Sequence, residues 1–308
     1  MNNEWDVVII GAGPAGLSAG IELAVFDLRV IVLEAASEPG STLREMKSID
    51  YYPGFPDGVP AGKFVERMVG HAKKEGAIIR TNEEVINLSL KGKDKLVETT
   101  KSKYSAKAVI IASGTPEVQE EGWWGVGVFY CVECCKDFLR GRDLILIGST
   151  SEAIDESLNL VDLPSRITLV NQANSIPLTQ THRAILSQKG VSLMEDRVAV
   201  RIGGKFLQKL VTLRSISNHE ETTIKADGVV VIGELKPIIK ILRKEGVKTH
   251  RQGCIIVDEH GMTNIDGVFA AGPCTSVCKT GVPRAVGEGS NVANTTRLYL
   301  TRRLKEKR

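Results

Sequence analysis

Two segments of the chain repeat one pattern, in which a short apolar run ends in a glycine-containing turn and continues into a helix-compatible stretch. The first lies at 6–16 and is followed by the apolar run Val30–Leu33; the second lies at 143–153 and is followed by Ile167–Val170. Continuous Val, Ile and Leu runs joined by short turns are typical of buried parallel strands, and strand–helix–strand alternation is typical of doubly wound units. The chain is therefore predicted to be an α/β protein with two Rossmann-like dinucleotide-binding domains.

Further strands and a last helix follow from the same reasoning. Apolar runs, most of them closed by a glycine, predict buried strands, and alternating runs predict antiparallel strands with one wet face. Buried strands are expected within Ala108–Gly114, Gly228–Gly233, Cys254–Val257 and Gly267–Gly272, and antiparallel strands within Ile86–Leu90 and Val211–Ile216. A final helix is expected from about Gly289 to Lys305.

Length and composition exclude several classes of protein. A chain of 308 residues is natural for two domains. With 42% hydrophobic residues, 25% charged residues and a net charge of +3, a disordered chain, a collagen-like repeat and a coiled coil are disfavoured. Scattered charges and 5% aromatic residues argue against nucleic-acid binding. The first apolar run, Val7–Ile10, is too short for a signal peptide or a membrane span, so a soluble cytoplasmic protein is expected.

The cysteines are few but clustered. The chain has six of them, at Cys131, Cys134, Cys135, Cys254, Cys274 and Cys278. Six in 308 residues is too sparse for a disulfide-stapled secreted scaffold, and three of them fall within five residues. This clustering indicates chemistry rather than stapling.

The first glycine turn has the form GxGxxG, at Gly11, Gly13 and Gly16, and Glu34 stands at the end of the next predicted strand. The first glycine permits a tight turn, the second lets the backbone approach a pyrophosphate, and the third lets helix and strand pack closely. The acidic residue can accept hydrogen bonds from an adenosine ribose. The alternative is a glycine turn without a ligand, and the motif alone does not distinguish FAD from NAD.

Cys131 and Cys134 form a CxxC pair that precedes a predicted helix. A helix N-terminus favours thiolate, and this spacing lets the two sulfurs close a disulfide, so the pair is suited to thiol–disulfide exchange. The alternative is a structural zinc site completed by Cys274 and Cys278. Because the two pairs fall in different predicted domains, no metal is predicted.

A series of motifs carries a resemblance to a known family. In chain order they are Gly13–Gly16, Tyr52–Gly58, Ala112–Gly114, the Cys131 and Cys134 pair, and Thr263–Gly272. Over nearly its whole length the chain resembles the low-molecular-weight thioredoxin reductases, a branch of the FAD-dependent pyridine nucleotide-disulfide oxidoreductases. The resemblance implies two domains of the three-layer ββα type, the second inserted in the first. Residues 1–115 plus 240–308 would bind FAD, and residues 116–239 would form the inserted NAD(P)H-binding-like domain that carries the CxxC. A homodimer and a thioredoxin-like partner protein are implied as well.

The resemblance also implies a set of FAD contacts. They are Gly11, Gly13, Pro14, Ala15, Gly16, Glu34, Ala35, Gly40, Ser41, Thr42, Leu43, Ala112, Ser113, Gly114, Gly272 and Pro273. Two positions depart from the family. Pro273 stands where the family has an aspartate that binds the ribityl chain, and Tyr51 stands where it has an asparagine. Proline has neither a carboxylate nor an N–H, so one FAD hydrogen bond is expected to be lost or rerouted.

For the redox pair, the resemblance implies that Cys134 faces the flavin and Cys131 attacks the partner. Cys135 occupies the position of the family's aspartate, which serves as a general acid, and a thiol is a poorer acid at neutral pH. Asp137 is a candidate substitute, although on a helix it would point to another side. Cys135 itself is either a small buried hydrophobe or a resolving thiol.

The remaining cysteines are given weaker roles. Cys274 and Cys278 form a candidate second redox pair near the flavin turn, and Cys254 is expected in the core.

The second glycine turn is degenerate. Gly148, Thr150 and Ala153 match GxGxxA except at Thr150, whose Cβ would crowd a pyrophosphate. NADPH-using relatives place arginines after the next strand, but no cationic residue occurs here before His182 and Arg183. Without a guanidinium the 2′-phosphate lacks a charge-assisted partner, so NAD(P)H binding is doubtful.

We therefore predict an FAD-dependent disulfide oxidoreductase of the thioredoxin reductase type. It would pass electrons from reduced flavin through a Cys131–Cys134 disulfide to a thioredoxin-like protein, with a donor that need not be NADPH. The alternatives are a flavin-dependent dithiol oxidase that uses oxygen and a non-catalytic flavoprotein or regulator with the same fold.

Overall fold

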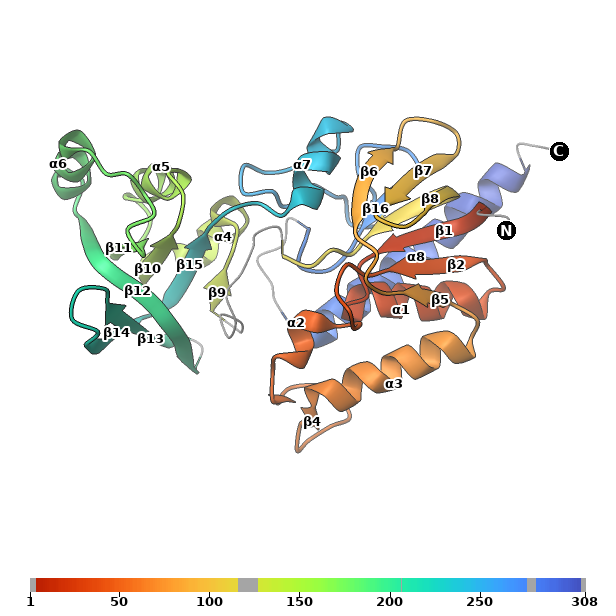
Figure 1. The fold of residues 1–308 in the computed structure, drawn as a ribbon, viewed down its shortest axis with the longest axis horizontal. Helices are drawn as coiled ribbons and strands as arrows, with labels where there is room; N and C mark the ends of the chain where they lie inside the picture. The colour runs from red at the N-terminus through yellow and green to blue at the C-terminus, as the bar shows by residue number, and fades with distance from the viewer. Residues whose placement is uncertain (1–3, 116–126, 206, 276–280, 306–308) are drawn as a thin grey trace. The chain divides into compact units, whose positions relative to one another are not determined.

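The computed structural model describes residues 4–115, 127–205, 207–275 and 281–305 (Figure 1). The helices are α1 (Pro14–Val25), α2 (Ser41–Arg44), α3 (Ala61–Lys74), α4 (Val132–Leu139), α5 (Glu152–Asn159), α6 (Gln180–Gln188), α7 (Pro237–Lys244) and α8 (Val282–Lys305). The strands of the first half are β1 (Glu4–Ile10), β2 (Val30–Leu33), β3 (Ser48–Ile49), β4 (Val59–Pro60), β5 (Ile78–Arg80), β6 (Val85–Ser89), β7 (Lys95–Thr99), β8 (Lys103–Ile111) and β9 (Val128–Phe129). Those of the second half are β10 (Asp143–Gly148), β11 (Arg166–Gln172), β12 (Val191–Lys205), β13 (Gln208–Ser215), β14 (Glu221–Ala226), β15 (Gly228–Ile232) and β16 (Val268–Ala270).

The chain divides into two compact units. The first combines Met1–Pro116 with Lys236–Arg308, and the second is Glu117–Leu235. Each unit has one large sheet built around parallel strands. The α/β fold class predicted from the two glycine turns is confirmed.

The sheet of the first unit has the strand order β5-β2-β1-β8-β7-β6, and β16 pairs with Val109–Ile111 of β8. β5, β2, β1, β8 and β16 run parallel, whereas β7 and β6 are antiparallel additions. In the register of the parallel strands Ile10 is opposite both Leu33 and Ile111, and Ile111 is opposite Ala270. The residues that follow these strands therefore meet at one edge of the sheet, where open α/β sheets bind ligands.

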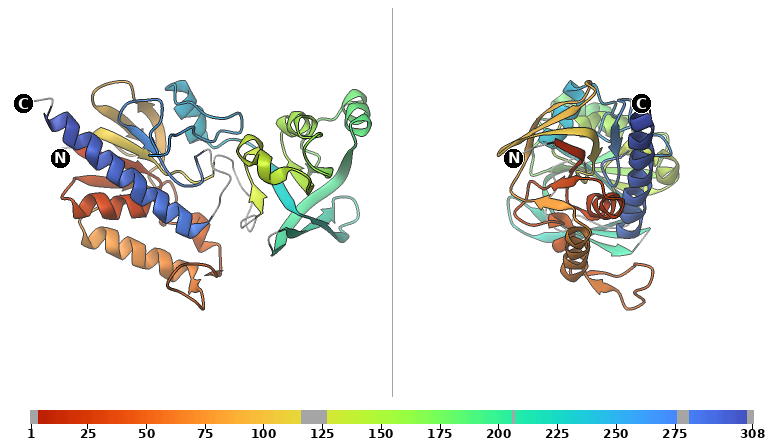
Figure 2. Two further views of the ribbon diagram at one scale, coloured as in Figure 1. Left: turned by 180° about the vertical axis from the view of Figure 1, so that it is seen from behind. Right: turned by 90° about the vertical axis from the view of Figure 1, so that its right-hand side faces the viewer.

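Helices α1, α3 and α8 pack together against this sheet, and α8 runs beside α1 (Figure 2). The helix begins at Val282, not near Gly289 as predicted. Gly289 lies inside the helix, and no larger residue fits there because a Cβ would stand 2.2 Å from the carbonyl oxygen of Ala15 on α1. The glycine thus permits close contact of two helices and does not mark a helix start.

The sheet of the second unit has the order β14-β13-β12-β11-β10-β15-β9. Its parallel strands β12, β11, β10, β15 and β9 are joined by two antiparallel strands, β13 and β14. Gly148 is opposite Asn171 on one side and Ile232 on the other, so the second glycine turn also begins at the carboxyl edge of its sheet.

Nearly all of the predicted strands are present. One is wrong: within Cys254–Val257 only Ile255 pairs with other segments, through isolated bridges to Thr249 and Thr275. The amide of Ile255 donates to the carbonyl of Cys274, and the carbonyl of Cys254 accepts from the amide of His250, so this segment bonds to two loops and extends no ladder.

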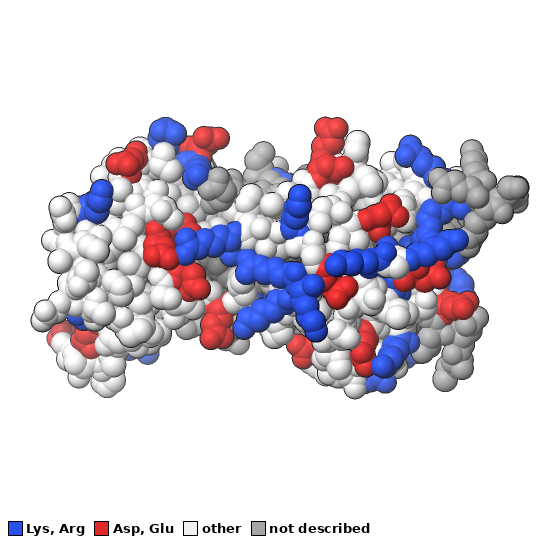
Figure 3. All heavy atoms as spheres, turned by 90° about the horizontal axis from the view of Figure 1, so that it is seen from above, with Lys and Arg blue, Asp and Glu red and all other residues white. Residues whose placement is uncertain are grey.

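The charged side chains and the apolar content of the helices were compared with what the composition predicts. Acidic and basic side chains both occur, among uncharged residues, on the face shown in Figure 3. None of the described helices has both the length and the apolar content needed to cross a membrane.

Candidate active site

The turn between β1 and α1 has the geometry of a phosphate-binding loop. Gly11 has φ +106°, and a Cβ on it would lie 2.3 Å from the carbonyl oxygen of Ala112. A Cβ on Gly16 would lie 1.9 Å from the carbonyl oxygen of Gly11, so both positions require glycine. Gly13 is the N-cap of α1 in an extended conformation, and a Cβ there would meet nothing within 4 Å among the described residues. The space next to Gly13 is thus open to a ligand at a helix N-terminus, with Pro14 and Ala15 in the first turn.

Glu34 faces this loop from the end of β2. Its Oε2 accepts a hydrogen bond from the amide of Ala12 at 2.9 Å, and its Oε1 accepts one from Ala36 at 3.0 Å. A carboxylate has about four acceptor positions, so each oxygen can still accept a hydroxyl proton. The adjacent Ala35 is exposed.

The segment after β8 adds a polar group without a partner. Ala112 is bound to the sheet through its amide, which donates to Ile10 at 2.8 Å. Ser113 and Gly114 follow, and the hydroxyl of Thr115 is buried with no hydrogen-bond partner in the described part of the chain. A buried hydroxyl of this kind is costly unless a ligand or water binds it.

Sequence reasoning missed Lys236, whose ammonium lies beside Gly114 in the segment that follows β8. Its Nζ is 3.8 Å from the position that a Cβ on Gly114 would take. Burial lowers the pKa of Lys236, and the nearby negative charge of Glu34 acts against that shift. No described residue accepts a hydrogen bond from this ammonium. No local motif marks it, because 122 positions separate Lys236 from Gly114 and only the fold brings them together.

Glu288 on α8 is a second residue that sequence reasoning missed. Its Oε2 accepts a hydrogen bond from the amide of Gly272 at 2.8 Å, and Arg284 pairs with its other oxygen. A half-buried carboxylate therefore lies against the turn that contains Pro273, where the sequence lacks the expected aspartate. The signal in the sequence was the spacing of Arg284 and Glu288, which is that of a helical ion pair.

The segment expected near the flavin forms the short helix α2. Gly40 precedes it with φ +68° and packs against Val65, and Leu43 is buried. The side chains of Ser41 and Thr42 lie outside the described residues. Tyr51, the second departure from the family, is 77% exposed.

Cys274 is a buried thiol outside any disulfide. Burial raises its pKa to about 12, and the thiol donates weak hydrogen bonds to the carbonyls of Ile111 and Ala271. A thiol that stays protonated is a poor nucleophile, which argues against the second redox pair; its other member, Cys278, lies outside the described residues. Cys254 is likewise a buried thiol, as expected for the core.

The cysteine cluster of the second unit lies at the start of α4. Cys131 directly precedes the helix and Cys135 is inside it; the two are 4% and 2% exposed, and both are disulfide-bonded. The side chain of Cys134 lies outside the described residues, so the pairing of Cys131 with Cys134 stays a prediction. A sulfur held in a disulfide is not a thiolate ligand, so Cys131 does not bind zinc in this state.

Aromatic contacts hold α4 against its own sheet. The ring of Phe138 on α4 packs on that of Phe129 on β9 with 4.7 Å between centroids, and the guanidinium of Arg142 lies 4.5 Å from the centroid of Phe138. Asp137 is exposed, so its carboxylate does not lie with the two buried sulfurs of Cys131 and Cys135.

The second glycine turn keeps the tight packing of the first and has a threonine in place of Gly13. A Cβ on Gly148 would lie 2.3 Å from that of Ala153. The hydroxyl of Thr150 is buried, with no hydrogen-bond partner in the residues that the structure describes. Glu152 and Asp155 occupy the first turn of α5, whereas the first turn of α1 contains no acidic residue. Carboxylates at a helix N-terminus neutralise the positive end of the dipole that would attract a pyrophosphate.

The end of β11 is closed by its own side chains. Asn171 and Gln172 are 1% and 5% exposed. The amide group of Asn171 donates to and accepts from the backbone of Ile176, and the oxygen of Gln172 accepts from the amide of Ala199 at 2.8 Å. The position after this strand therefore presents buried amides and no charge.

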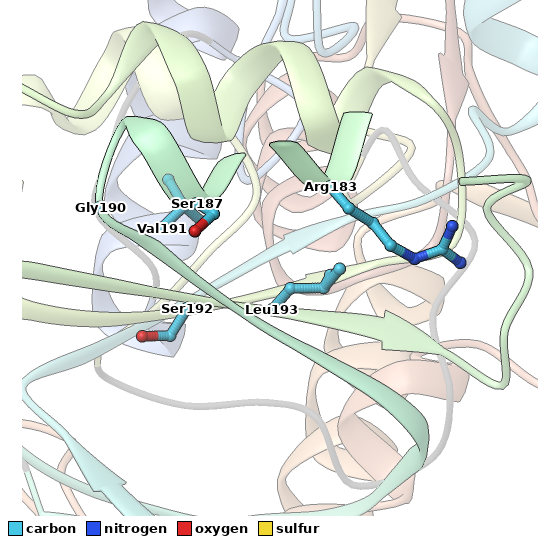
Figure 4. Close-up of a pocket in the computed structure, with 6 residues that line it drawn as sticks. All are labelled: Arg183, Ser187, Gly190, Val191, Ser192 and Leu193. Atoms are coloured by element: carbon cyan, nitrogen blue, oxygen red, sulfur yellow. The ribbon is translucent and has the colours of Figure 1, made fainter. Parts of the chain in front are cut away.

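The first cationic residues after β11 are also engaged. Arg183 on α6 forms a two-bond ion pair with Glu195 on β12, at 2.9 and 2.8 Å, and donates to the carbonyl of Leu178. The ring of His182 accepts from the amide of Thr179 in a capping box. Figure 4 shows Arg183 beside a hollow at the start of β12, whose other lining residues are Ser187, Gly190, Val191, Ser192 and Leu193. This hollow lies at the amino end of β12, away from the carboxyl edge at which Gly148 stands.

Comparison with known proteins agrees with this arrangement. The family model described as pyridine nucleotide-disulphide oxidoreductase matches residues 5–291. Thioredoxin reductase of Bacillus subtilis is 30% identical over 310 residues, which cover 96% of this chain and 95% of the relative.

Solved structures agree as well. The thioredoxin reductase of Streptococcus pyogenes has a TM-score of 0.61 at 26% identity, with 98% of this chain and 99% of that one covered. A ferredoxin-flavin thioredoxin reductase from Clostridium acetobutylicum has a TM-score of 0.53 at 29% identity, with 96% and 99% covered.

The predicted family is thereby confirmed. The chain belongs to the pyridine nucleotide-disulphide oxidoreductase family and is an FAD-dependent oxidoreductase of the low-molecular-weight thioredoxin reductase type.

Proposed function

We propose that this protein reduces the disulfide of a thioredoxin-like protein through Cys131 and Cys134, with electrons that do not come from NADPH. The observation that carries the disulfide chemistry is the cysteine cluster at the amino end of α4, in which Cys131 is already in disulfide form. A thiolate at the start of a helix lies at the positive end of the helix dipole, so the reduced Cys131 is suited to attack.

The first unit supplies the residues that hold FAD. Bound FAD accepts and delivers the electron pair, and the protein groups bind and orient it. The open space beside Gly13 would take the pyrophosphate, Glu34 would accept hydrogen bonds from the adenosine ribose, and the ammonium of Lys236 would balance the pyrophosphate charge. Glu288 would supply, for the ribityl chain, the carboxylate that Pro273 lacks.

The thiol chemistry conserves electrons at each step. The thiolate of Cys131 attacks one sulfur of the partner's disulfide and releases the other as a thiolate, which takes a proton. Attack on Cys131 by Cys134 then closes their disulfide and releases the second partner thiol, so the partner gains two electrons and two protons. Because Cys131 is 4% exposed, a conformation that uncovers it is needed before a protein can be attacked.

The second unit supports a donor other than NADPH. Buried amides end β11, Arg183 is paired with Glu195, and Glu152 lies in the first turn of α5. A 2′-phosphate would meet no available guanidinium there, and a pyrophosphate would meet a carboxylate. A protein donor such as a reduced ferredoxin needs neither site, and the relative from Clostridium acetobutylicum is named for such a donor.

Anaerobic titration of the flavin spectrum tests this proposal. We expect reduced ferredoxin to bleach the flavin in the purified holoprotein, while NADPH and NADH at a hundredfold excess leave it oxidised. A thioredoxin should then reoxidise the flavin of the wild-type protein and not that of Cys131→Ser. Rapid bleaching by NADPH would overturn the proposed donor, and unchanged reoxidation in Cys131→Ser would overturn the proposed cysteine route. Reoxidation by oxygen alone, with no response to a thioredoxin disulfide, would instead indicate a dithiol oxidase.

A further inference from the structure

One segment of the chain carries a concentrated positive charge. Residues 236–251 contain six Lys or Arg residues and one acidic residue, Glu245, so the net charge of this segment is +5. The whole chain has a net charge of +3, so the remaining residues together are net negative. A local excess of one sign creates a field that attracts a partner of the opposite sign.

This segment forms α7 and the loop that follows it. Ile239 and Leu242 are buried, whereas Lys240, Arg243 and Lys244 are exposed. Lys240 comes three residues before Arg243 and four before Lys244, so the three cations share one side of the helix. Figure 3 views the molecule from above Figure 1 and shows basic side chains gathered on the side where α7 lies.

Two lysines from neighbouring segments extend this side. Lys91 follows β6, and its Cε is 3.8 Å from the position that a Cβ on Gly246 would take. Lys248 is exposed, and its backbone amide donates to the side chain of Asn264 at 2.8 Å. The exposed cations of α7 and its surroundings form what we call the α7 basic surface: Lys91, Lys240, Arg243, Lys244 and Lys248.

The described residues leave the charges of the α7 basic surface without neutralising partners. Its four lysines form no ion pair within the described ranges of the chain. Arg243 donates to one hydroxyl and two carbonyls, all of them neutral acceptors, at 2.7–2.9 Å. Glu245 is half-buried, and its Oε2 accepts from the amide of Leu90 at 2.9 Å. The positive charge is therefore available to a partner.

Helix α7 begins at the candidate FAD site. Lys236 is its N-cap, and the ammonium of Lys236 lies 3.8 Å from the position that a Cβ on Gly114 would take. A helix of eight residues is about 12 Å long. A protein that binds the exposed side of α7 is therefore held within about one helix length of the site that would hold FAD.

We propose that the α7 basic surface is the docking site of the electron donor, an acidic one-electron carrier protein of the ferredoxin type. This inference rests on the proposed function, because it states where the donor of that reaction binds. Each docking event delivers one electron, so two reduced carriers are oxidised for each disulfide reduced, and two protons come from solvent. Electron-carrier complexes bury little surface, so attraction between opposite charges governs how fast they form.

The position of α7 in the chain favours the donor over the disulfide partner. The helix belongs to the unit 236–308 plus 1–116, which contains the candidate FAD site, whereas Cys131 belongs to the other unit. The donor must deliver electrons to the flavin, and the disulfide partner must reach Cys131.

Charge reversal on α7 tests this docking site in the holoprotein under anaerobic conditions. Reduced ferredoxin should bleach the flavin of Lys240→Glu/Lys244→Glu about tenfold or more slowly than that of the wild type at low salt. Lys63→Glu/Arg67→Glu is the matched control, because it reverses two exposed cations at the same helical spacing on α3, and it should keep the wild-type rate. Lys240→Gln/Lys244→Gln should give an intermediate rate, and it provides the same test if the reversed variant does not fold. Reduced methyl viologen, a small reductant that needs no docking, should bleach all four proteins at the same rate.

Salt provides a second measurement. The Debye length falls from about 30 Å at 0.01 M ionic strength to about 3 Å at 1 M. This change should slow bleaching of the wild type by ferredoxin about tenfold and have little effect on Lys240→Glu/Lys244→Glu.

The failure of this inference can be told apart from the failure of the proposed function. A wild-type rate of bleaching by ferredoxin in Lys240→Glu/Lys244→Glu would overturn the docking site and leave the proposed donor in place. Slower reoxidation by a thioredoxin in that variant, with unchanged bleaching, would assign the surface to the disulfide partner and also overturn the inference. If reduced ferredoxin does not bleach the wild-type flavin at all, the proposed donor itself is wrong.

Discussion

Two glycines of the first turn should give opposite results when each is replaced by alanine. A Cβ on Gly16 would lie 1.9 Å from the carbonyl oxygen of Gly11, and that oxygen belongs to the backbone and cannot rotate away. We expect Gly16→Ala to lower the free energy of unfolding by about 2 kcal/mol or more, the usual range for forced overpacking. A Cβ on Gly13 meets nothing within 4 Å in the described structure.

The expected cost of Gly13→Ala to the fold is small. Gly13 is an N-cap with φ −77° and ψ −178°, which any residue adopts. Alanine is a poorer N-cap than glycine by about 0.5–1 kcal/mol, and the reduced freedom of the unfolded chain returns a similar amount. The two effects nearly cancel, so the apoprotein should keep its stability to within about 1 kcal/mol.

The same change should weaken FAD binding. The new methyl group occupies the space next to the helix N-terminus and displaces the pyrophosphate from its amide donors. Each charge-assisted hydrogen bond is worth about 1.5–3 kcal/mol, so the loss of one or two raises the Kd for FAD roughly 100-fold. Urea unfolding of the apoprotein and quenching of FAD fluorescence separate the two effects. Wild-type FAD affinity in Gly13→Ala, or a loss of apoprotein stability as large as that of Gly16→Ala, would refute this account of the loop.

Two further predictions concern buried groups of the first unit. Lys236→Met should weaken the binding of both FAD and ADP about tenfold or more, because each ligand has a diphosphate and the ammonium has no described hydrogen-bond partner. Lys236→Arg, which keeps the charge, should keep most of the affinity. Unchanged ADP binding in Lys236→Met, measured by calorimetry, would show that Lys236 does not contact the diphosphate. Burial raises the pKa of Cys274 from 9.0 to about 12, so the thiol stays protonated in the folded state, whereas in the unfolded chain it ionises above pH 9. The contribution of Cys274 to the free energy of unfolding is therefore complete below pH 9 and falls by about 1.4 kcal/mol per pH unit between pH 9 and 12. The stability difference between wild type and Cys274→Ala, from urea unfolding under reducing conditions, should therefore shrink by about 2 kcal/mol from pH 8 to pH 10.5, and a constant difference would contradict the assignment.

Local patterns of the sequence predicted the fold well, but features that depend on residues far apart in the sequence were missed. Continuous Val, Ile and Leu runs placed β1 and β10 because their burial is complete on both faces of a parallel sheet. The start of α8 was misplaced because a glycine in the sequence usually suggests the end of a helix. Only the packing of α1 against Gly289 explains why a glycine occurs inside α8. Lys236 and Glu288 were missed for the same reason: their partners, Gly114 and Gly272, come near only in the folded chain.

The cysteines show the same limit at the site itself. The spacing predicted a redox pair of Cys131 and Cys134 but left the role of Cys135 open, because a buried hydrophobe and a resolving thiol have the same side chain. The structure adds that the sulfur of Cys135 is bonded. It also adds the burial that keeps Cys274 protonated, which no count or spacing of cysteines contains.

The second unit departs from a dinucleotide site by more than a missing arginine. If only the cation had been lost, the end of β11 would be an uncharged and accessible edge. Instead Asn171 and Gln172 are buried and hold the backbone of that loop, and Arg183 is held by Glu195. These bonds stabilise the loop in a closed form, so restoring NADPH binding would require breaking buried hydrogen bonds at about 1–3 kcal/mol for each group left unpaired. A single arginine introduced after β11 should therefore not confer NADPH reduction of the flavin. NADPH reduction of the flavin in such a single-arginine variant would refute the view that these buried bonds, and not the missing cation alone, close this edge.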